Sequence, residues 1–186
     1  MEAAIYSFSL RGAELAKRIE AVLSDLDYSV SNKTVAKYAE QAALAPMLPD
    51  HNAACGEDFA RCQLLVFVGA VGIAVRTIAP YIKSKLTDPA VLSIDERGNF
   101  VIPLLAGHIG GANEMARYVA AALKAQACVT TATDVNGLFA VDEWAARNNM
   151  VLCSLKAAKR WWLAILWACM WTRGLRLLAT CPSRWK

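Results

Sequence analysis

Acidic residues are absent from the last part of this sequence. All 16 Asp and Glu lie within residues 1–159, together with 15 of the 20 Lys and Arg, so this stretch carries a formal net charge of −1. Residues 160–186 hold the other five cations and no acid. The overall charge of +4 therefore comes from the tail and does not indicate a nucleic-acid-binding surface, which needs basic residues clustered on the folded domain.

Metal-ligand spacings and long apolar runs are also missing. The longest apolar run, residues 161–171, is too short to span a bilayer, and the opening MEAAIYSFSLRG is unlike a signal peptide. The sequence has neither a Gly-Lys-Ser/Thr phosphate loop nor a Gly-x-Ser-x-Gly nucleophile turn. The cysteines show no Cys-x-x-Cys or zinc-type spacing, which predicts reduced thiols in a cytoplasmic protein; they are residues 55, 62, 128, 153, 169 and 181.

What is present is an alternation of strand and helix patterns in a chain that is 56% hydrophobic. We expect an α/β fold: a three-layer domain with a central, mainly parallel sheet and one β-hairpin. Residues 44–58 read as a loop, and residues 90–105 as the hairpin. The other predicted strands are 3–8, 28–35, 62–70 and 127–134, and the predicted helices are 11–26, 72–82, 111–126 and 140–149.

Three polar or glycine-rich segments each follow a predicted strand. They are GAVGIAVRT from residue 69, AGHIGGANE from residue 106 and TTATDVNG from residue 130. Ligands of open α/β sheets bind beyond the carboxyl ends of the strands. We therefore expect one crevice lined by all three segments.

The segment AGHIGGANE combines glycines with one of the chain's two histidines. Its glycines permit positive φ and close approach by a ligand, and the helix start that follows offers N–H groups to an anion. His108 can donate or accept a proton near neutral pH. The competing interpretation is a tight strand-to-helix turn with an incidental histidine, and spacing alone favours it. TTATDVNG has a similar alternative, an Asp/Asn turn before a helix.

Two longer blocks carry a resemblance to a known family. Residues 72–117, GIAVRTIAPYIKSKLTDPAVLSIDERGNFVIPLLAGHIGGANEMAR, and residues 129–145, VTTATDVNGLFAVDEWA, resemble the cobalt-precorrin 5A hydrolases, the CbiG family of anaerobic cobalamin biosynthesis. The similarity covers residues 1–159 and is densest from 69 to 145. It implies a hydrolase that opens the δ-lactone of a contracted macrocycle and releases a two-carbon fragment as acetaldehyde, giving cobalt-precorrin 5B.

The resemblance also implies what the protein binds. The substrate is a cobalt-corrinoid intermediate that brings its own cobalt, so no cofactor and no metal site of the protein are expected. We expect neither nucleic acid nor membrane as a partner, and either a homodimer or contacts with other enzymes of the cobalamin pathway. The alternative function is a non-catalytic module that binds a tetrapyrrole or another polyanion.

Candidate site residues follow from the three segments and the resemblance. His108 is the first candidate for a catalytic base, followed by Glu114 and Asp134, and N–H groups between Gly110 and Asn113 are expected to hold an oxyanion or a substrate carboxylate. Arg76 can bind a carboxylate bidentately. The expected substrate-binding residues are Arg76, Thr77, Gly107, Gly110, Gly111, Asn113, Thr131, Thr133 and Asn136.

The tail departs from the family pattern. Five of the six tryptophans fall after residue 160, and one choice of permitted codons, read one nucleotide earlier, gives a sequence with acidic residues, glycine and proline instead. We therefore expect a CbiG-like α/β region at 1–159 and an aberrant, frameshifted tail at 160–186, with the family's C-terminal domain missing. The rival interpretation is an interfacial membrane helix at RWWLAILWACMWTR.

Overall fold

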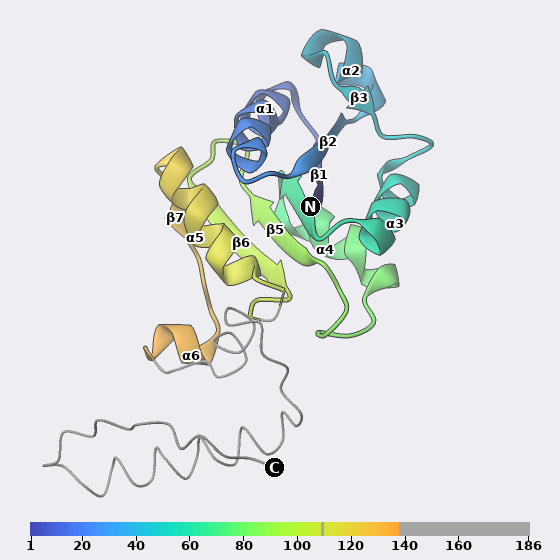
Figure 1. Ribbon diagram of the computed structural model, residues 1–186. Helices are drawn as coiled ribbons and strands as arrows, with labels where there is room; N and C mark the ends of the chain where they lie inside the picture. The colour runs from blue at the N-terminus through green and yellow to red at the C-terminus, as the bar shows by residue number, and fades with distance from the viewer. Residues whose placement is uncertain (109, 138–186) are drawn as a thin grey trace, which may run out of the picture. The chain divides into compact units, whose positions relative to one another are not determined.

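Strands and helices alternate along the described part of the chain (Figure 1). The computed structural model describes residues 1–108 and 110–137. The predicted helix at 140–149 and the tail at 160–186 lie outside these residues. The elements are β1 (Glu2–Ser7), α1 (Leu10–Ser24), β2 (Ser29–Thr34), α2 (Ala36–Ala42), β3 (Ala45–Pro46), α3 (His51–Arg61), β4 (Leu64–Val68), α4 (Val71–Ile78), the 3-10 turn η1 (Ala79–Tyr81), β5 (Ala90–Ile94), β6 (Phe100–Leu105), α5 (Ala112–Leu123), β7 (Gln126–Ala127) and α6 (Ala132–Val135).

The strands form one seven-stranded sheet in the order β3-β2-β1-β4-β5-β6-β7. The first five strands of that order are parallel, β6 runs antiparallel to β5, and β7 is parallel to β6. Helices α1 and α5 cover one face, and α3 and α4 cover the other (Figure 1). This confirms the expected three-layer α/β fold with a mainly parallel sheet and a β5–β6 hairpin.

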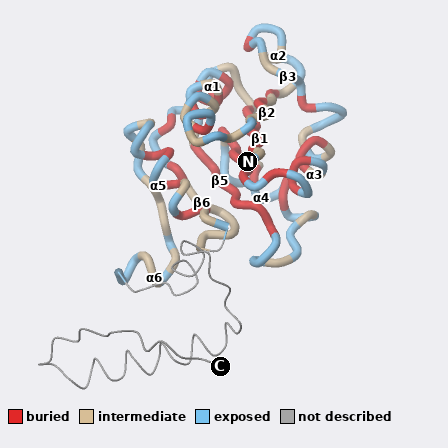
Figure 2. The backbone as a smooth tube through the Cα atoms, viewed as in Figure 1, coloured by how far each residue is buried: buried red, intermediate tan, exposed pale blue. Residues whose placement is uncertain are grey.

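Burial explains why these segments fold as they do. All five residues of β4 are buried, as expected for a strand with helices on both faces (Figure 2). In α1 the apolar residues recur at helical spacing, and Leu15, Ile19 and Leu23 pack into the core cluster under α1 and α5. On the opposite face, the rings of Tyr6 and Phe67 stack with their centroids 4.9 Å apart.

The hairpin separates the two edges of the sheet. Val68 at the end of β4 pairs with Ile94 at the end of β5, whereas Leu105 at the end of β6 pairs with Val91 near the start of β5. The segment after β4 therefore begins at one edge, whereas the segment after β6 lies at the other. The expectation that all three segments follow strand ends at a single edge is wrong, because an antiparallel strand carries its carboxyl end to the opposite edge.

Two local expectations also fail. Within the expected loop 44–58, the structure has β3 and most of α3, whose first N–H groups are capped by Asp50 Oδ1 at 2.8 Å from Asn52 N and 2.9 Å from Ala53 N. The expected strand 127–134 is reduced to β7, and the chain turns into α6 after Thr131. Among the described residues, no helix is long and apolar enough to cross a membrane.

Candidate functional site

The loop between β6 and α5 folds back over the start of its own helix. The N–H of Gly111 donates to His108 O at 3.0 Å, that of Ala112 to Ala106 O at 3.2 Å, and that of Asn113 to Gly107 O at 3.0 Å. These three N–H groups are therefore already hydrogen-bonded inside the protein. The expectation that they bind an oxyanion or carboxylate is wrong for this conformation, because the loop carbonyls occupy them.

The three glycines of this loop serve different needs. Only Gly111 has a positive φ, 77°, and it forms the N-cap of α5. A Cβ on Gly107 would lie 2.9 Å from Asn113 Oδ1, and one on Gly110 would lie 2.9 Å from Ala106 O and still closer to Ala106 Cβ. Gly107 and Gly110 therefore permit close approach between parts of the protein. The structure shows this internal packing where the sequence suggested contact with a ligand.

His108 lies beside two side chains from the segment after β7. Its Nε2 is 3.0 Å from Asp134 Oδ2 and 2.9 Å from Thr133 Oγ1. The two segments meet because β7 is parallel to β6 and carries the chain toward the same edge. The structure thus brings together the two predicted segments AGHIGGANE and TTATDVNG, whereas GAVGIAVRT begins at the other edge.

Asp134 is the centre of this cluster. Its Oδ2 also accepts from Asn113 Nδ2 at 3.0 Å and from the Thr131 hydroxyl, and its Oδ1 accepts from Arg117 Nη2. The amide of Asn113 donates a further hydrogen bond to Thr131 Oγ1 at 2.9 Å. We call His108, Asn113, Arg117, Thr131, Thr133 and Asp134 the His108 cluster.

The environment of Asp134 keeps its carboxylate ionised. Burial alone raises the pKa of this group, but hydrogen bonds from Thr131, Arg117 and His108, and the charge of Arg117, outweigh it. The pKa of Asp134 therefore lies well below its usual range. Such a carboxylate is a weak proton acceptor and a good partner for a positive or polarised N–H. The catalytic role expected for Asp134 stays a prediction.

The remaining predicted residues lie outside this cluster. Glu114 is exposed in the first turn of α5, and Arg76 is exposed on α4, where its Nη1 donates to Gly72 O at 3.2 Å. Asn136 is exposed and donates to Ala132 O at 2.8 Å. Thr77 is fully buried within α4, which does not suit a substrate contact.

Arg117 belongs to the cluster and was missed by the sequence analysis. It lies four residues after Asn113 on α5, so both side chains project from one face of the helix. The signal was therefore present as an i,i+4 pair beside a predicted site residue. It was overlooked because a single exposed arginine on a helix is usually only a solvated surface group.

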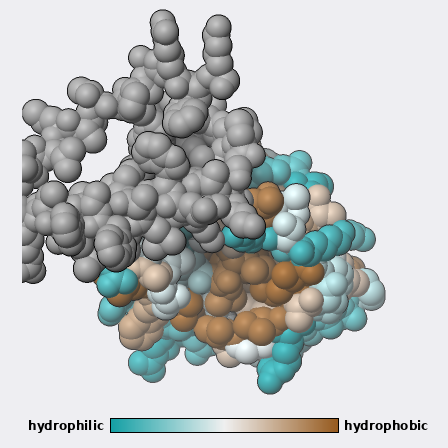
Figure 3. All heavy atoms as spheres, turned by 90° about the horizontal axis from the view of Figure 1, so that it is seen from below, coloured by the Kyte–Doolittle hydropathy of each residue, from teal (hydrophilic) through white to brown (hydrophobic). Residues whose placement is uncertain are grey.

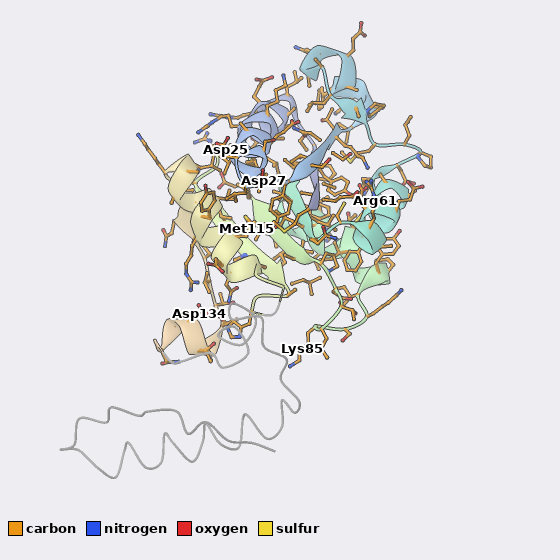
Figure 4. All side chains as sticks on the ribbon, in the orientation of Figure 1. Asp25, Asp27, Arg61, Lys85, Met115 and Asp134 are labelled. Atoms are coloured by element: carbon orange, nitrogen blue, oxygen red, sulfur yellow. The ribbon has the colours of Figure 1, made fainter. Side chains whose placement is uncertain are left out.

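The edge that holds the cluster also carries apolar surface. Seen from below, the described residues show apolar side chains gathered in the middle of this face, with hydrophilic side chains around them (Figure 3). Ile82 and Leu86, about half exposed, lie in the segment that leads into β5 at this edge. Lys83 and Lys85 in the same segment are exposed, and Lys85 and Asp134 lie at the same end of the molecule (Figure 4). This edge therefore combines apolar area, cations and a histidine.

A resident metal is not indicated by side-chain geometry in this part of the chain. Across residues 1–108 and 110–137, no three His, Cys, Asp or Glu side chains are grouped so that they can hold a metal ion. The expectation that the protein works without a cofactor or metal of its own stays a prediction.

Comparison with known proteins places the cluster in a family context. Residues 53–134 match the family described as Cobalamin synthesis G N-terminal. Cobalt-precorrin-5A hydrolase from Salmonella typhimurium is 40% identical over 155 residues, which cover 83% of this chain and 42% of that protein. Cobalt-precorrin-5A hydrolase from Priestia megaterium is 51% identical over 87 residues, or 47% of this chain and 23% of that protein.

A solved structure agrees with these relatives. A protein from Sulfolobus solfataricus, described as a homolog of cobalamin biosynthesis protein G, superposes with a TM-score of 0.54 at 25% identity, covering 98% of this chain and 51% of that one. The chain thus spans less than half the length of the two curated relatives and about half of the solved one. By the matched residues, the two curated relatives and the solved fold, the chain belongs to the CbiG family of cobalamin synthesis proteins and carries that family's N-terminal region.

Proposed function

We propose that this chain acts in cobalamin biosynthesis as a cobalt-precorrin-5A hydrolase, which opens the δ-lactone of its substrate and releases acetaldehyde to give cobalt-precorrin 5B. The observation that carries the proposal is the His108–Asp134 contact of 3.0 Å, because it places an oriented imidazole at the sheet edge. Both residues lie within the segment that matches the family. Two relatives of the chain are named for this activity.

In the first step, neutral His108 accepts a proton from a water molecule as the water oxygen attacks the lactone carbonyl. The tetrahedral intermediate then expels the ring oxygen, which takes a proton from the His108 imidazolium. The products are a carboxylic acid, which ionises, and a free hydroxyl. Ionised Asp134 stabilises the imidazolium that exists between the two proton transfers.

The second step releases the two-carbon unit. Removal of the proton from the new hydroxyl lets its oxygen form the carbonyl of acetaldehyde while the bond between that carbon and the macrocycle breaks. The electron pair of the broken bond passes to the macrocycle carbon, which is then protonated. His108 is again neutral at the start of this step and is our first candidate for the base, with Glu114 as the second.

The surface at this edge suits a large carboxylated ring. Apolar side chains such as Ile82 and Leu86 offer contact area to the macrocycle, and Lys83 and Lys85 offer charge to its carboxylates (Figure 3). We propose that the cobalt ion enters and leaves as part of the substrate. A homodimer or an assembly with other enzymes of the pathway is also proposed.

Acetaldehyde release from cobalt-precorrin 5A tests the proposal directly. The 186-residue chain is expected to release acetaldehyde, and His108→Ala is expected to lower kcat/KM by about 10²- to 10⁴-fold, the usual contribution of a general base. His51→Ala is the matched control, because His51 begins α3 and contacts Phe8 edge-on. It is expected to retain activity.

Two outcomes would contradict the proposal. Full activity in His108→Ala would make His108 structural and the assigned base wrong. Tight binding of the substrate without release of acetaldehyde, by the chain and by a frame-corrected version alike, would favour the non-catalytic binding module.

A further inference from the structure

Opening of a lactone places a negative charge on the carbonyl oxygen, and a hydrogen-bond donor is needed to hold it. Enzymes that cleave acyl bonds aim fixed donors at this oxyanion, and one donor contributes about 10²- to 10³-fold to kcat. The N–H groups of Gly111, Ala112 and Asn113 already donate to carbonyls of their own loop. The donor for the proposed reaction is therefore to be sought among the side chains around His108.

Arg117 and His108 contact the same carboxylate at different oxygens. Arg117 Nη2 donates to Asp134 Oδ1, while His108 Nε2 lies 3.0 Å from Asp134 Oδ2. One carboxylate thus joins a guanidinium to the imidazole that is proposed as the base, and the two groups lie close together at this edge of the sheet. A guanidinium stays charged throughout the pH range of a folded protein, so it donates hydrogen bonds without exchanging protons.

The guanidinium of Arg117 is held at one end and exposed at the other. Asn113 is 2% exposed and its amide donates to Asp134 Oδ2 at 3.0 Å, which fixes the carboxylate that Arg117 contacts. The Arg117 side chain itself is 46% exposed. Because a guanidinium carries several N–H donors in a planar fork, those that do not contact Asp134 can face a ligand. Arg117 is therefore a fixed donor beside the proposed base.

We infer that Arg117 is a further catalytic residue of the proposed reaction, and that it donates a hydrogen bond to the oxyanion formed when the lactone carbonyl is attacked. The water oxygen bonds to the carbonyl carbon, the electron pair of the C=O double bond moves to the carbonyl oxygen, and His108 takes a proton from the water. Arg117 stabilises the charged oxygen until the C=O bond forms again and the ring oxygen leaves. This role rests on the proposed function, because it belongs to the first of its two steps.

Single-turnover opening of cobalt-precorrin 5A by the full chain, followed by mass spectrometry as the gain of one water, tests the role of Arg117. Arg117→Met is expected to lower the maximal rate of ring opening by about 10²- to 10³-fold, with little change in the half-saturating substrate concentration. Arg97→Met is the matched control and is expected to keep the wild-type rate, because Arg97 is exposed in the turn between β5 and β6 at the opposite edge.

The same measurement separates contact with the oxyanion from binding of a substrate carboxylate. A higher half-saturating concentration at an unchanged maximal rate in Arg117→Met would make Arg117 an anchor for the substrate and overturn the inference. An unchanged maximal rate with unchanged saturation would overturn it as well. Arg117→Lys keeps a positive charge with fewer donors, so its rate is expected to lie between those of the wild-type chain and Arg117→Met.

A double variant separates contact with the oxyanion from an effect through His108. When a catalytic base is removed, the rate enhancement that remains comes from oxyanion donors and binding. Adding Arg117→Met to His108→Ala is therefore expected to lower the remaining rate of ring opening by about a further tenfold or more. A double variant no slower than His108→Ala would show that Arg117 acts only by positioning the base, and would overturn the inference.

Folding and the second step of the reaction are checked separately. Circular dichroism shows whether each variant is folded; should Arg117→Met not fold, Arg117→Lys takes its place in both backgrounds, and a wild-type rate of ring opening in Arg117→Lys then overturns the inference. A wild-type chain that opens the ring but releases no acetaldehyde would count against the proposed function alone, because Arg117 acts before that release. A chain that opens no ring would overturn both.

Discussion

Two aspartates of this protein, Asp58 and Asp134, are surrounded in similar ways but perform different tasks. Asp58 on α3 accepts from the Tyr6 hydroxyl and from Lys33 Nζ, each at 2.5 Å, and from Arg61 Nη2 at 3.0 Å. Asp134 likewise accepts from a hydroxyl and an arginine, but its Oδ2 also lies 3.0 Å from His108 Nε2. A carboxylate that accepts hydrogen bonds from a cation and a hydroxyl is therefore not enough to identify a functional site.

Burial and the partners' chemistry account for the difference. The side chain of Asp58 is 2% exposed, that of Asp134 11%. Burial raises the pKa of Tyr6, and the hydrogen bond to Asp58 raises it further, so this phenol stays protonated. Tyr6 and Lys33 belong to β1 and β2, and Asp58 thus ties α3 to the sheet. The partner of Asp134 is instead an imidazole, a group that can both accept and donate a proton in catalysis.

Removing the charge of each aspartate is expected to give the largest difference in stability between the two regions. Asp58→Asn is expected to lower the free energy of unfolding by about 3–5 kcal/mol, because it leaves Lys33 with an uncompensated charge at a mostly buried position. Asp134→Asn is expected to lower it by about 1–2 kcal/mol, since half-exposed Arg117 returns to solvent. Urea unfolding followed by circular dichroism measures both, and equal losses would refute the distinction.

Substitutions of two glycines in the loop between β6 and α5 are expected to have different effects. One should lower only the stability of the chain, and the other should also disturb the surroundings of His108. Gly111→Ala places a Cβ at φ 77° with no atom within 4 Å, so we expect a loss of about 1–2 kcal/mol from backbone strain alone. Gly107→Ala pushes against the Asn113 amide and is expected to alter the His108 nitrogen signals as well. Unfolding curves and 15N NMR spectra of the chain labelled with 15N-histidine distinguish the two variants. Undisturbed His108 signals in Gly107→Ala would contradict the close packing of Gly107 against Asn113.

Lowering the pH is expected to reduce the stabilising contributions of both Asp58 and Asp134. Burial raises the pKa of Asp58, but hydrogen bonds from Lys33, Tyr6 and Arg61 outweigh it, so the pKa of Asp58, like that of Asp134, is lowered in the folded state. The folded chain then binds fewer protons than the unfolded chain, whose aspartates titrate near about pH 3.9. Their stabilising contribution is present above that pH and is lost as the pH falls through the lower folded values.

Unfolding free energies measured from neutral pH downward check this dependence. Each Asp→Asn variant is expected to show a flatter decline below about pH 4 than the wild-type chain, because one group with a lowered folded-state pKa has been removed. A decline of unchanged slope in both variants would show that other carboxyl groups govern acid unfolding.

Thiol labelling should give the smallest difference between the two regions. Burial raises the pKa of Cys55 to about 12, and nearby Asp58 adds to the effect, so its thiolate is scarce at neutral pH. Cys128, on the segment leading to α6, is only partly buried. Mass spectrometry after brief alkylation is expected to find Cys128 modified and Cys55 protected, and faster labelling of Cys55 would show that the region around Asp58 opens readily.

The fold was largely predictable because its signals are local. The apolar run of β4, the helical spacing in α1 and the turn around Gly98 each depend on a few neighbouring residues. The helix α3 was missed because its sequence, HNAACGEDFAR, carries polar residues and a glycine, and its stability comes from packing of Cys55 and Phe59 and from the Asp50 cap. Tertiary contacts outweigh weak helix propensity here.

The sequence by itself determined the α/β class, the hairpin and the residue types at which proton chemistry is available, namely His108 and Asp134. Only the tertiary structure decided which segments meet. The hairpin reverses β6, so AGHIGGANE and TTATDVNG share an edge, whereas GAVGIAVRT begins at the opposite one. The tertiary structure also decided that Arg117 donates a hydrogen bond to Asp134 and that loop carbonyls accept from the N–H groups at the start of α5. Hydrogen bonds between distant residues depend on strand direction and register, which no local pattern encodes.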